Sequence, residues 1–333
     1  MIPERHFRVY GLPVRVRSDS HEFLDFVEGH YAAFSSRDVG SDAPVLDVEF
    51  SEQAGEMARA RALELPQIGA DLRTTATEVY WENPFGFAVH VSDLGWWQVK
   101  MYHFDLLNSP PPPARYENYQ RSMRWGIHYP LFSLLELGQG KQLAHASALG
   151  CRGVGYLLMG LNGVGKSTLA TYLSLNKGLQ LLADNYVLYD ERFIYPFPER
   201  LRLSRASLDH LGLRREDGAV EVYGKYQLPI PAEIEPLRPG ACFLVLRGPE
   251  LTAKPLALEA VPSIKAALDD YLQEYPRYSY LGVWLALRGL ARSLSSEGSS
   301  LWRCPWFVVH VPRTWELEPI AEVIEQCVST CSG

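Results

Sequence analysis

Residues 160 to 168 read Gly160-Leu161-Asn162-Gly163-Val164-Gly165-Lys166-Ser167-Thr168, and this stretch decides how the rest of the chain is interpreted. It fits the pattern G-x-x-x-x-G-K-[ST], in which a glycine-rich loop wraps phosphate groups. Its glycines permit positive backbone angles, so that successive amide groups can approach phosphate oxygens closely. Lys166 adds a full charge for the β- and γ-phosphates, and the Ser167 hydroxyl is the expected ligand of Mg²⁺. ATP and Mg²⁺ are therefore the expected cofactors.

The context of the loop supports this interpretation. Val154–Met159 is a short apolar run typical of a buried strand, and Thr168–Leu173 continues as a helix with an apolar face. Strand, glycine loop and helix is the order that phosphate binding requires, whereas a glycine-rich surface turn with a lysine would not need it. The residues of the loop expected to bind nucleotide are Gly160, Asn162, Gly163, Val164, Gly165, Lys166, Ser167 and Thr168.

Composition excludes several classes of protein. The chain has 333 residues, of which 47% are hydrophobic, enough for two cores. A net charge of −7 argues against a nucleic-acid-binding surface, and five scattered cysteines without ligand spacing argue against zinc and for a reducing compartment. No apolar stretch is long enough to cross a membrane, and the first residues lack the features of a secretory signal. We expect a cytoplasmic protein with no membrane or nucleic-acid partner.

The pattern of the first 130 residues predicts a small, mostly antiparallel α+β module. Ser20–Val27 reads as a capped amphipathic helix. Short alternating or apolar runs predict strands at Phe7–Tyr10, Pro13–Val16, Val45–Phe50, Glu78–Trp81, Phe87–Val91 and Trp96–Met101. Four consecutive prolines, Pro110–Pro113, mark a linker or an exposed loop. We therefore predict an α/β protein with two domains, an N-terminal module over 1–130 that is a candidate for acceptor recognition, and a P-loop domain over 131–333.

Asp184 is the main candidate for acid–base chemistry. It ends the apolar run Gly178–Ala183, which places a carboxylate at the edge of a sheet where phosphate loops also open. Such an aspartate can bind Mg²⁺ together with Ser167, or accept the proton of an attacking hydroxyl. The alternative is an ordinary aspartate in a turn.

Four stretches of the chain carry a family resemblance: His145-Ala146-Ser147, the loop from Gly160 to Ser167, Leu182-Ala183-Asp184-Asn185, and Tyr195–Ser204. Together they resemble the HPr kinase/phosphorylase-like proteins, P-loop kinases structurally akin to phosphoenolpyruvate carboxykinase. The resemblance implies phosphoryl transfer from ATP to a hydroxyl, usually a serine of a protein or peptide. By position it implies that Asp184 is the general base and that His145 lies beside it, although a core histidine is the alternative. Lys166, Asp184 and His145 are thus the expected catalytic residues.

The chain departs from the family at two points. The second aspartate of the family's pair is Asn185 here, which argues against the reverse, phosphorolytic reaction. The glycine-rich acidic signature of the bifunctional enzymes is missing, and the first 130 residues do not resemble their regulatory domain. The resemblance is therefore to relatives that modify peptides or small molecules, more than to the sugar-uptake regulator itself.

Three cations are candidates to neutralise charge on the phosphates: Arg202, Arg205 and Lys225. Arg202 lies opposite the leucines of an alternating strand, and Lys225 lies in a loop-like stretch, Tyr223–Pro229, where a solvated lysine is the alternative. We expect Arg202 and Lys225 to contact nucleotide. Aromatic residues at helical spacing could form an acceptor pocket or the edge of a core: Tyr271, Tyr275, Tyr278, Tyr280 and Trp284.

Three functions fit these features. The first is an ATP- and Mg²⁺-dependent kinase whose acceptor is a hydroxyl of a peptide, protein or small molecule. The second is a nucleotide-binding regulator or scaffold without transferase activity, and the third is an NTPase motor or switch, which the lack of a recognisable arginine finger or switch motif disfavours. The sequence leaves open the acceptor, the phosphate donor and the oligomeric state, a homo-oligomer included.

Overall fold

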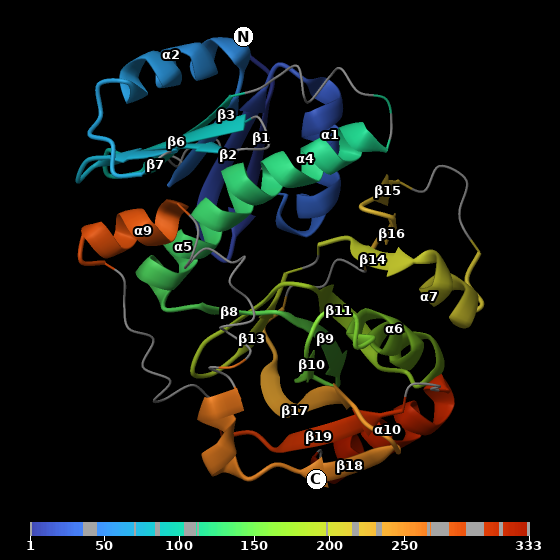
Figure 1. Cartoon of the computed structure of the whole chain (residues 1–333). Helices are drawn as coiled ribbons and strands as arrows, with labels where there is room; N and C mark the ends of the chain where they lie inside the picture. Colours follow the sequence, from blue (N-terminus) through green and yellow to red (C-terminus); the bar gives the residue numbers. More distant parts are fainter. Residues whose placement is uncertain are drawn as a thin grey trace. The chain divides into compact units, whose positions relative to one another are not determined.

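A computed structural model describes most of the chain, namely residues 2–35, 45–69, 71–83, 87–102, 111, 113–197, 199–214, 220–230, 235–264, 267, 280–290, 303–312 and 316–331. The chain divides into two compact units (Figure 1). The first comprises Met1–Gln139 with the later segments Glu221–Tyr223 and Glu274–Ser293, and the second comprises the rest. The division therefore falls at residue 139 where the sequence suggested 130, since helix α5 (Tyr129–Gln139) groups with the first unit.

The first unit is built on a seven-stranded mixed sheet with the order β1-β2-β3-β7-β6-β5-β4. Strand β3 runs parallel to both of its neighbours, β2 and β7, and all other pairs in this sheet are antiparallel. The mostly antiparallel pairing agrees with the sequence pattern. The strands are β1 (Glu4–Val9), β2 (Leu12–Ser18), β3 (Leu46–Phe50), β4 (Leu72–Thr74), β5 (Glu78–Asn83), β6 (Phe87–Asp93) and β7 (Trp97–Tyr102).

Helices bury one face of this sheet. Helix α1 (His21–Tyr31) starts where the Ser20 hydroxyl accepts a hydrogen bond from the amide of Phe23, as its sequence predicted. Helix α4 (Ala114–Met123) runs through a π-helical turn, η3 (Arg124–His128), into α5. A Cβ at Gly126 would lie 2.3 Å from Met101 Sδ, so only glycine lets this turn press so closely on the sheet.

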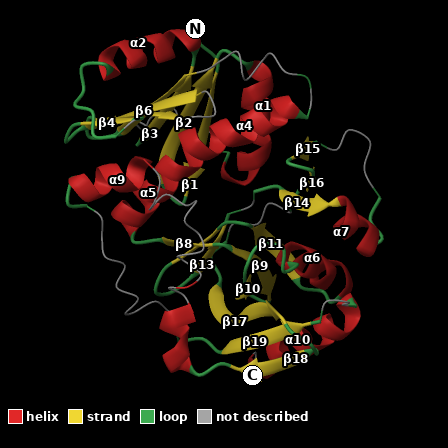
Figure 2. Cartoon of the chain, in the orientation of Figure 1, coloured by secondary structure: helices red, strands yellow, loops and turns green. Residues whose placement is uncertain are grey.

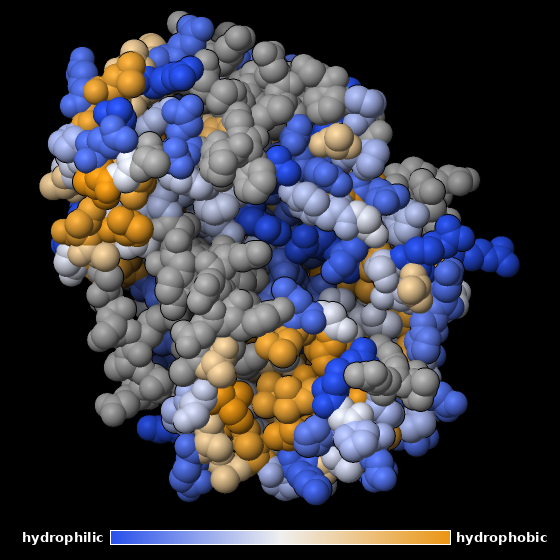
Figure 3. All heavy atoms as spheres, in the orientation of Figure 1, coloured by the Kyte–Doolittle hydropathy of each residue, from blue (hydrophilic) through white to orange (hydrophobic). Residues whose placement is uncertain are grey.

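Helix α9 (Tyr280–Leu287) returns from late in the sequence to complete the same unit. Trp284 is fully buried, and the Tyr280 ring stacks on Trp81 with centroids 5.2 Å apart. These two aromatics are core residues, whereas Tyr271, Tyr275 and Tyr278 lie outside the described part of the chain. Hydrophobic residues gather over α9 at the left of Figure 3, and on this helix Val283 and Leu287 are exposed.

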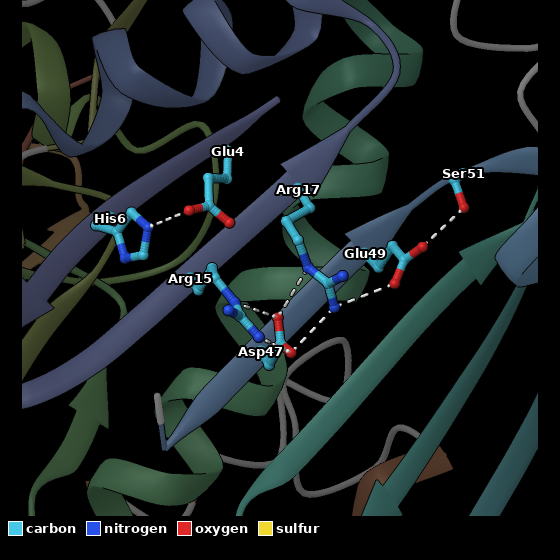
Figure 4. Close-up of polar contacts among 7 residues, drawn as sticks. All are labelled: Glu4, His6, Arg15, Arg17, Asp47, Glu49 and Ser51. Carbon is cyan, nitrogen blue, oxygen red and sulfur yellow. Dashed lines mark hydrogen bonds and ion pairs between the residues drawn. The ribbon is translucent and has the colours of Figure 1, made fainter. Parts of the chain in front are cut away.

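The other face of this sheet is polar and is covered in part by helix α2 (Glu52–Ala62). Asp47 of β3 is 3% exposed and accepts hydrogen bonds from Arg15 and Arg17 of β2 at 2.7 to 3.3 Å (Figure 4). Two guanidinium groups thus neutralise one buried carboxylate, the condition under which burying such a charge is tolerated. The 3₁₀ turn η1 (Ala32–Phe34) and the short strand β15 (Glu221–Val222) also belong to this unit.

The second unit is built on a six-stranded sheet with the order β11-β9-β10-β17-β19-β18 (Figure 2). Strands β10, β17 and β19 run parallel, and the remaining neighbours pair antiparallel. The strands are β9 (Ala146–Cys151), β10 (Val154–Met159), β11 (Gln180–Asp184), β17 (Arg238–Arg247), β18 (Thr252–Pro255) and β19 (Trp306–Val311). Helices α6 (Lys166–Asn176) and α10 (Leu317–Cys331) share one apolar core with this sheet.

Smaller elements flank this sheet. Strands β8 (Gln142–Ala144), β12 (Val187–Tyr189) and β13 (Ile194–Pro196) form a small antiparallel sheet. Strand β14 (Leu201–Ser204) pairs antiparallel with β16 (Lys225–Leu228) and continues into helix α7 (Arg205–His210), and a 3₁₀ turn, η4, spans Leu258–Ala260. The loop expected around Lys225 is thus a strand, because Tyr226 and Leu228 alternate with polar residues and pack toward the core. The mixed α/β fold class is confirmed.

Two further expectations concern parts of the chain that are only partly described. Two of the four residues in the proline run Pro110–Pro113, at positions 110 and 112, lie outside the described residues. None of the helices in the described residues combines the length and apolar character that a membrane span requires.

Candidate functional site

The glycine-rich loop joins β10 to α6, as the sequence predicted. Gly160, Gly163 and Gly165 have φ of 142°, 76° and 103°, angles that residues with a Cβ rarely adopt. At Gly160 space is also limiting, because a Cβ there would lie 2.4 Å from the carbonyl oxygen of Val245 on β17. Val164 turns its side chain into the core below the loop, so it anchors the loop and leaves its backbone to face outward.

Lys166 starts helix α6 and bends back over the loop. Its Nζ donates to the carbonyl oxygens of Gly160 at 2.8 Å and Leu161 at 3.2 Å. Burial lowers the pKa of Lys166 to about 8, the charge of Lys225 acts in the same direction, and Asp184 opposes them. A buried ammonium whose hydrogen bonds go to neutral carbonyl groups is stabilised further when a charged phosphate oxygen binds to it.

Asp184 is aimed at this loop by a bulge in strand β11. Gln180 and Leu181 pair with Gly150 and Leu149, but the next pair is Ala183 with Ala148, so Leu182 is an extra residue. Strict alternation would place Asp184 on the face of Leu182; the bulge instead turns it to the face of Leu181, which packs in the core cluster that contains α6.

On that face Asp184 lies directly opposite Ser147 of β9. The fully buried Ser147 hydroxyl donates to Asp184 Oδ1 at 2.6 Å, and Ser167 of the loop also bonds to the carboxylate. Burial raises the pKa of Asp184, while the bonds from the two serines and the charges of Arg202 and Lys166 hold it down. The site therefore contains a carboxylate with raised proton affinity beside the glycine loop, a feature of general bases.

Strands β14 and β16 bring two cations to the same place. Leu201, Leu203 and Tyr226 pack into the core from one face of this two-stranded ladder. The opposite face presents Arg202 and Lys225, and Lys225 pairs in register with Ser204. Desolvation lowers the pKa of Lys225, the charge of Arg202 lowers it further, and Asp184 opposes both.

These groups line one cavity of about 300 Å³ in the second unit. It lies at the lower end of the size range of small-molecule sites. The predicted site residues that line it are His145, Asn162, Gly163, Gly165, Lys166, Ser167, Thr168, Asp184, Arg202 and Lys225. Gly160 and Val164 do not line it, because one lies against β17 and the other packs into the core.

The histidine of the site is neutral at physiological pH. Burial lowers the pKa of His145 to about 3, the charges of Lys166 and Arg202 add to this, and bonds to the Asn162 side chain and the Asn185 backbone oppose it. His145 thus joins the glycine loop to the segment that carries Asp184. It can orient these groups by hydrogen bonds, but it brings no positive charge to the cavity.

Asn185 follows Asp184 in a left-handed conformation, with φ of 77°. Asparagine tolerates this angle better than most residues, and its Nδ2 donates to the fully buried Glu199 at 3.1 Å. The cavity therefore contains an amide at the position where the family resemblance implies a second carboxylate.

The sequence did not predict that five further residues line the cavity: Asn185, Leu203, Ser204, Ser207 and Arg247. The placement of Arg247 after the apolar run Ala241–Leu246 was a usable signal, since it ends a predicted strand as Asp184 does. Arg205, in contrast, is 74% exposed, pairs with Asp209 at 3.5 Å and does not line the cavity.

The donor set fits magnesium held together with phosphates. Mg²⁺ prefers oxygen ligands and is bound in nucleotide sites by one or two carboxylates or hydroxyls, phosphate oxygens and water. Ser167 and Asp184 bring one hydroxyl and one carboxylate into contact beside the loop. Among the described residues there is no group of three or more His, Cys, Asp or Glu side chains that could hold a metal ion by themselves.

Comparisons with known proteins add little to this geometry. No family model matches the chain, and no curated protein matches it. Among solved structures the chain is similar to the Hpr(Ser) kinase/phosphatase from Coxiella burnetii, with 12% sequence identity over 58% of this chain and 99% of that chain. The TM-score is 0.29, at which a likeness carries no argument, so the site is judged on its own residues.

Proposed function

We propose that this chain is an ATP- and Mg²⁺-dependent kinase that transfers the γ-phosphoryl group to a hydroxyl of a peptide, protein or small molecule. The observation that carries the proposal is the meeting of Lys166, Ser167 and Asp184 in one cavity at the end of a glycine-rich loop. Phosphoryl transfer needs cradled phosphates, charge neutralisation and a carboxylate near the attacking hydroxyl. The sequence motifs that resemble HPr kinase/phosphorylase-like proteins support the same class.

In this proposal the chain's own residues act in three ways. The amides of the loop and the N-terminus of α6 hold the phosphates, and Lys166 exchanges its carbonyl partners for phosphate oxygens. Mg²⁺, when bound, would neutralise phosphate charge next to Ser167 and Asp184. Asp184 accepts the proton of the acceptor hydroxyl while the new oxygen–phosphorus bond forms and the bond to the leaving ADP oxygen breaks.

A second function, a nucleotide-binding regulator without transferase activity, has one observation in its favour. Asn185 replaces a carboxylate, and its bond to Glu199 fixes an amide in the cavity wall. Fewer negative charges near the metal weaken catalysis more than they weaken nucleotide binding. Such a protein would bind magnesium nucleotide yet transfer nothing.

Transfer of label from γ-³²P-labelled ATP to proteins and metabolites of a cell extract distinguishes the kinase from the regulator. We expect labelled products with the parent chain and a loss of about 10²–10⁴-fold in rate for Asp184→Asn, the contribution of a general base. Asp209→Asn is the matched control, because Asp209 is 66% exposed on α7 and lies outside the cavity. Calorimetry with Mg·ADP, run in parallel, shows whether each variant still binds nucleotide.

The outcomes separate the two functions. Tight Mg·ADP binding without labelled product from any extract would favour the regulator. Equal transfer rates for the parent and Asp184→Asn would remove Asp184 as the base, and no affinity for Mg·ADP would refute both functions.

A further inference from the structure

The cavity has more positive charge than a magnesium nucleotide can neutralise. It is lined by Lys166, Arg202, Lys225 and Arg247 and by a single carboxylate, Asp184, which gives a formal surplus of three positive charges. A magnesium-bound nucleoside triphosphate brings about two net negative charges. His145 is neutral, since its pKa lies near 3, so the occupied cavity keeps about one uncompensated positive charge.

The four cations differ in how they are held. Lys166 bonds to the carbonyl groups of the glycine loop, and Arg247 Nη1 donates to the carbonyl oxygen of Pro312 at 3.2 Å. The side chains of Arg202 and Lys225 make no hydrogen bond or ion pair with any other residue that the structure describes. These two are therefore the cations with free donors for a ligand.

Arg202 and Lys225 also share one face of the β14–β16 ladder, where each repels the other. Their neighbours on this face are polar, while the opposite face fixes the ladder in the core through Leu201, Leu203 and Tyr226. Two cations held near each other on a rigid support form a site for an anion, because an anion between them relieves the repulsion. The field of both reaches Asp184, so an anion bound here lies close to the proposed base.

We infer that the acceptor carries an anionic group, a phosphate or a carboxylate, near the hydroxyl that is phosphorylated, and that Arg202 and Lys225 bind this group. The inference rests on the proposed kinase function and names the class of its acceptor. The contrasting assignment gives both cations to the phosphates of ATP. The two assignments differ in whether an anion still binds after a triphosphate has filled the loop.

Calorimetry on the full chain saturated with Mg²⁺ and the non-hydrolysable analogue AMP-PNP makes this distinction. The analogue fills the γ-phosphate position, and inorganic phosphate and acetate are then titrated in separate experiments as phosphate and carboxylate probes. We expect at least one of them to bind the saturated complex. Arg202→Gln and Lys225→Gln should each weaken that binding about 10-fold or more, as expected for losing a charged hydrogen bond, and should change AMP-PNP affinity by less than about 3-fold.

Arg205→Gln is the matched control, because Arg205 is near in sequence but exposed and outside the cavity, and it should leave both affinities unchanged. Thermal melts of each variant show that the chain is folded. Failure of both probes to bind the saturated complex would overturn the inference, and so would a loss of AMP-PNP affinity in the two variants as large as their loss of probe affinity. If the parent chain does not bind AMP-PNP at all, the kinase function itself fails, and the inference fails with it.

Discussion

At the scale of single residues, the proton affinity of Asp184 depends on the hydroxyl of Ser147. Burial raises the pKa of the carboxylate, and the 2.6 Å hydrogen bond from Ser147 lowers it. In Ser147→Ala the pKa should rise further, because the carboxylate loses a hydrogen bond that favours its charged form. A general base acts only when deprotonated, so if Asp184 has that role the acidic limb of the rate profile should move to higher pH.

The measurement is the initial rate of phosphoryl transfer between pH 5 and 9, with Mg·ADP affinity as the control for the nucleotide site. A rate that falls equally at every pH would show that Ser147 only supports the packing of β9. An unchanged profile would show that Asp184 is not the group that titrates.

At the scale of elements, the bulge in β11 determines the direction of Asp184 and depends on Gly150. A Cβ at Gly150 would lie 2.7 Å from Leu182 Cδ1, the side chain of the extra residue. Gly150→Ala should therefore displace Leu182, lower the free energy of unfolding by about 1–3 kcal/mol and reduce phosphoryl transfer through misplacement of Asp184. The double variant Gly150→Ala, Leu182→Ala removes the clash and should regain part of the activity although it leaves a cavity.

Denaturant unfolding and transfer rates of the two single variants and the double variant form a complete cycle. Additive losses, with no activity regained, would show that Gly150 and Leu182 do not act together. The cycle thus measures whether the bulge, and not the strand alone, positions Asp184.

This bulge also marks the limit of what the sequence predicts. Apolar periodicity predicted most elements, because the alternation in β3 and the apolar run of β10 are direct consequences of burial. The glycine loop was predictable because its spacing is imposed by phosphate geometry. The face of β11 on which Asp184 lies was not predictable, because an inserted residue reverses the alternation of side chains between the two faces without changing the composition. The strand around Lys225 was missed because it is short and is stabilised by pairing with β14, which is distant in sequence.

At the scale of the whole molecule, stability should fall in acid through a buried pair in the first unit. His90 Nε2 lies 3.0 Å from Glu78 Oε2, and Arg61 also bonds to this carboxylate. Desolvation lowers the pKa of His90 below its ordinary 6.5 and outweighs the bond to Glu78. Desolvation acts to raise the pKa of Glu78, but the hydrogen bonds from Arg61 and His90 outweigh it and bring this pKa below 4.5.

Both groups have folded-state pKa values below their unfolded values, so the unfolded chain binds their protons more tightly and each contribution to stability is lost as the pH falls. The loss begins below about pH 6.5 for His90 and below about pH 4.5 for Glu78, so His90 dominates the range above pH 4.5. Thermal melts between pH 7.5 and 4.5 should show a steadily lower Tm. His90→Gln should have a lower Tm than the parent at pH 7.5, yet its Tm should fall less than that of the parent as the pH is lowered. Parallel curves for the two proteins would exclude His90 as a source of the acid sensitivity.

The order of the chain also predicts how the molecule can be divided. The first unit takes its last helix, α9, from residues 280–287, after most of the second unit has been passed. Trp284 of that helix is fully buried, donates to the carbonyl oxygen of Thr75 at 3.2 Å and lies with its ring centroid 5.4 Å from that of Trp97. Removing a buried tryptophan costs about 3–5 kcal/mol, a large share of the stability of a domain of this size.

A fragment of residues 1–139 should therefore fail to fold cooperatively, although it contains the whole seven-stranded sheet. Trp284→Ala in the full chain should lower the free energy of unfolding by about 3–5 kcal/mol. Circular dichroism melts and limited proteolysis of the fragment, with the full chain as reference, measure this. A sharp, reversible transition in the fragment at the temperature of the full chain would show that α9 only covers a unit that is complete without it.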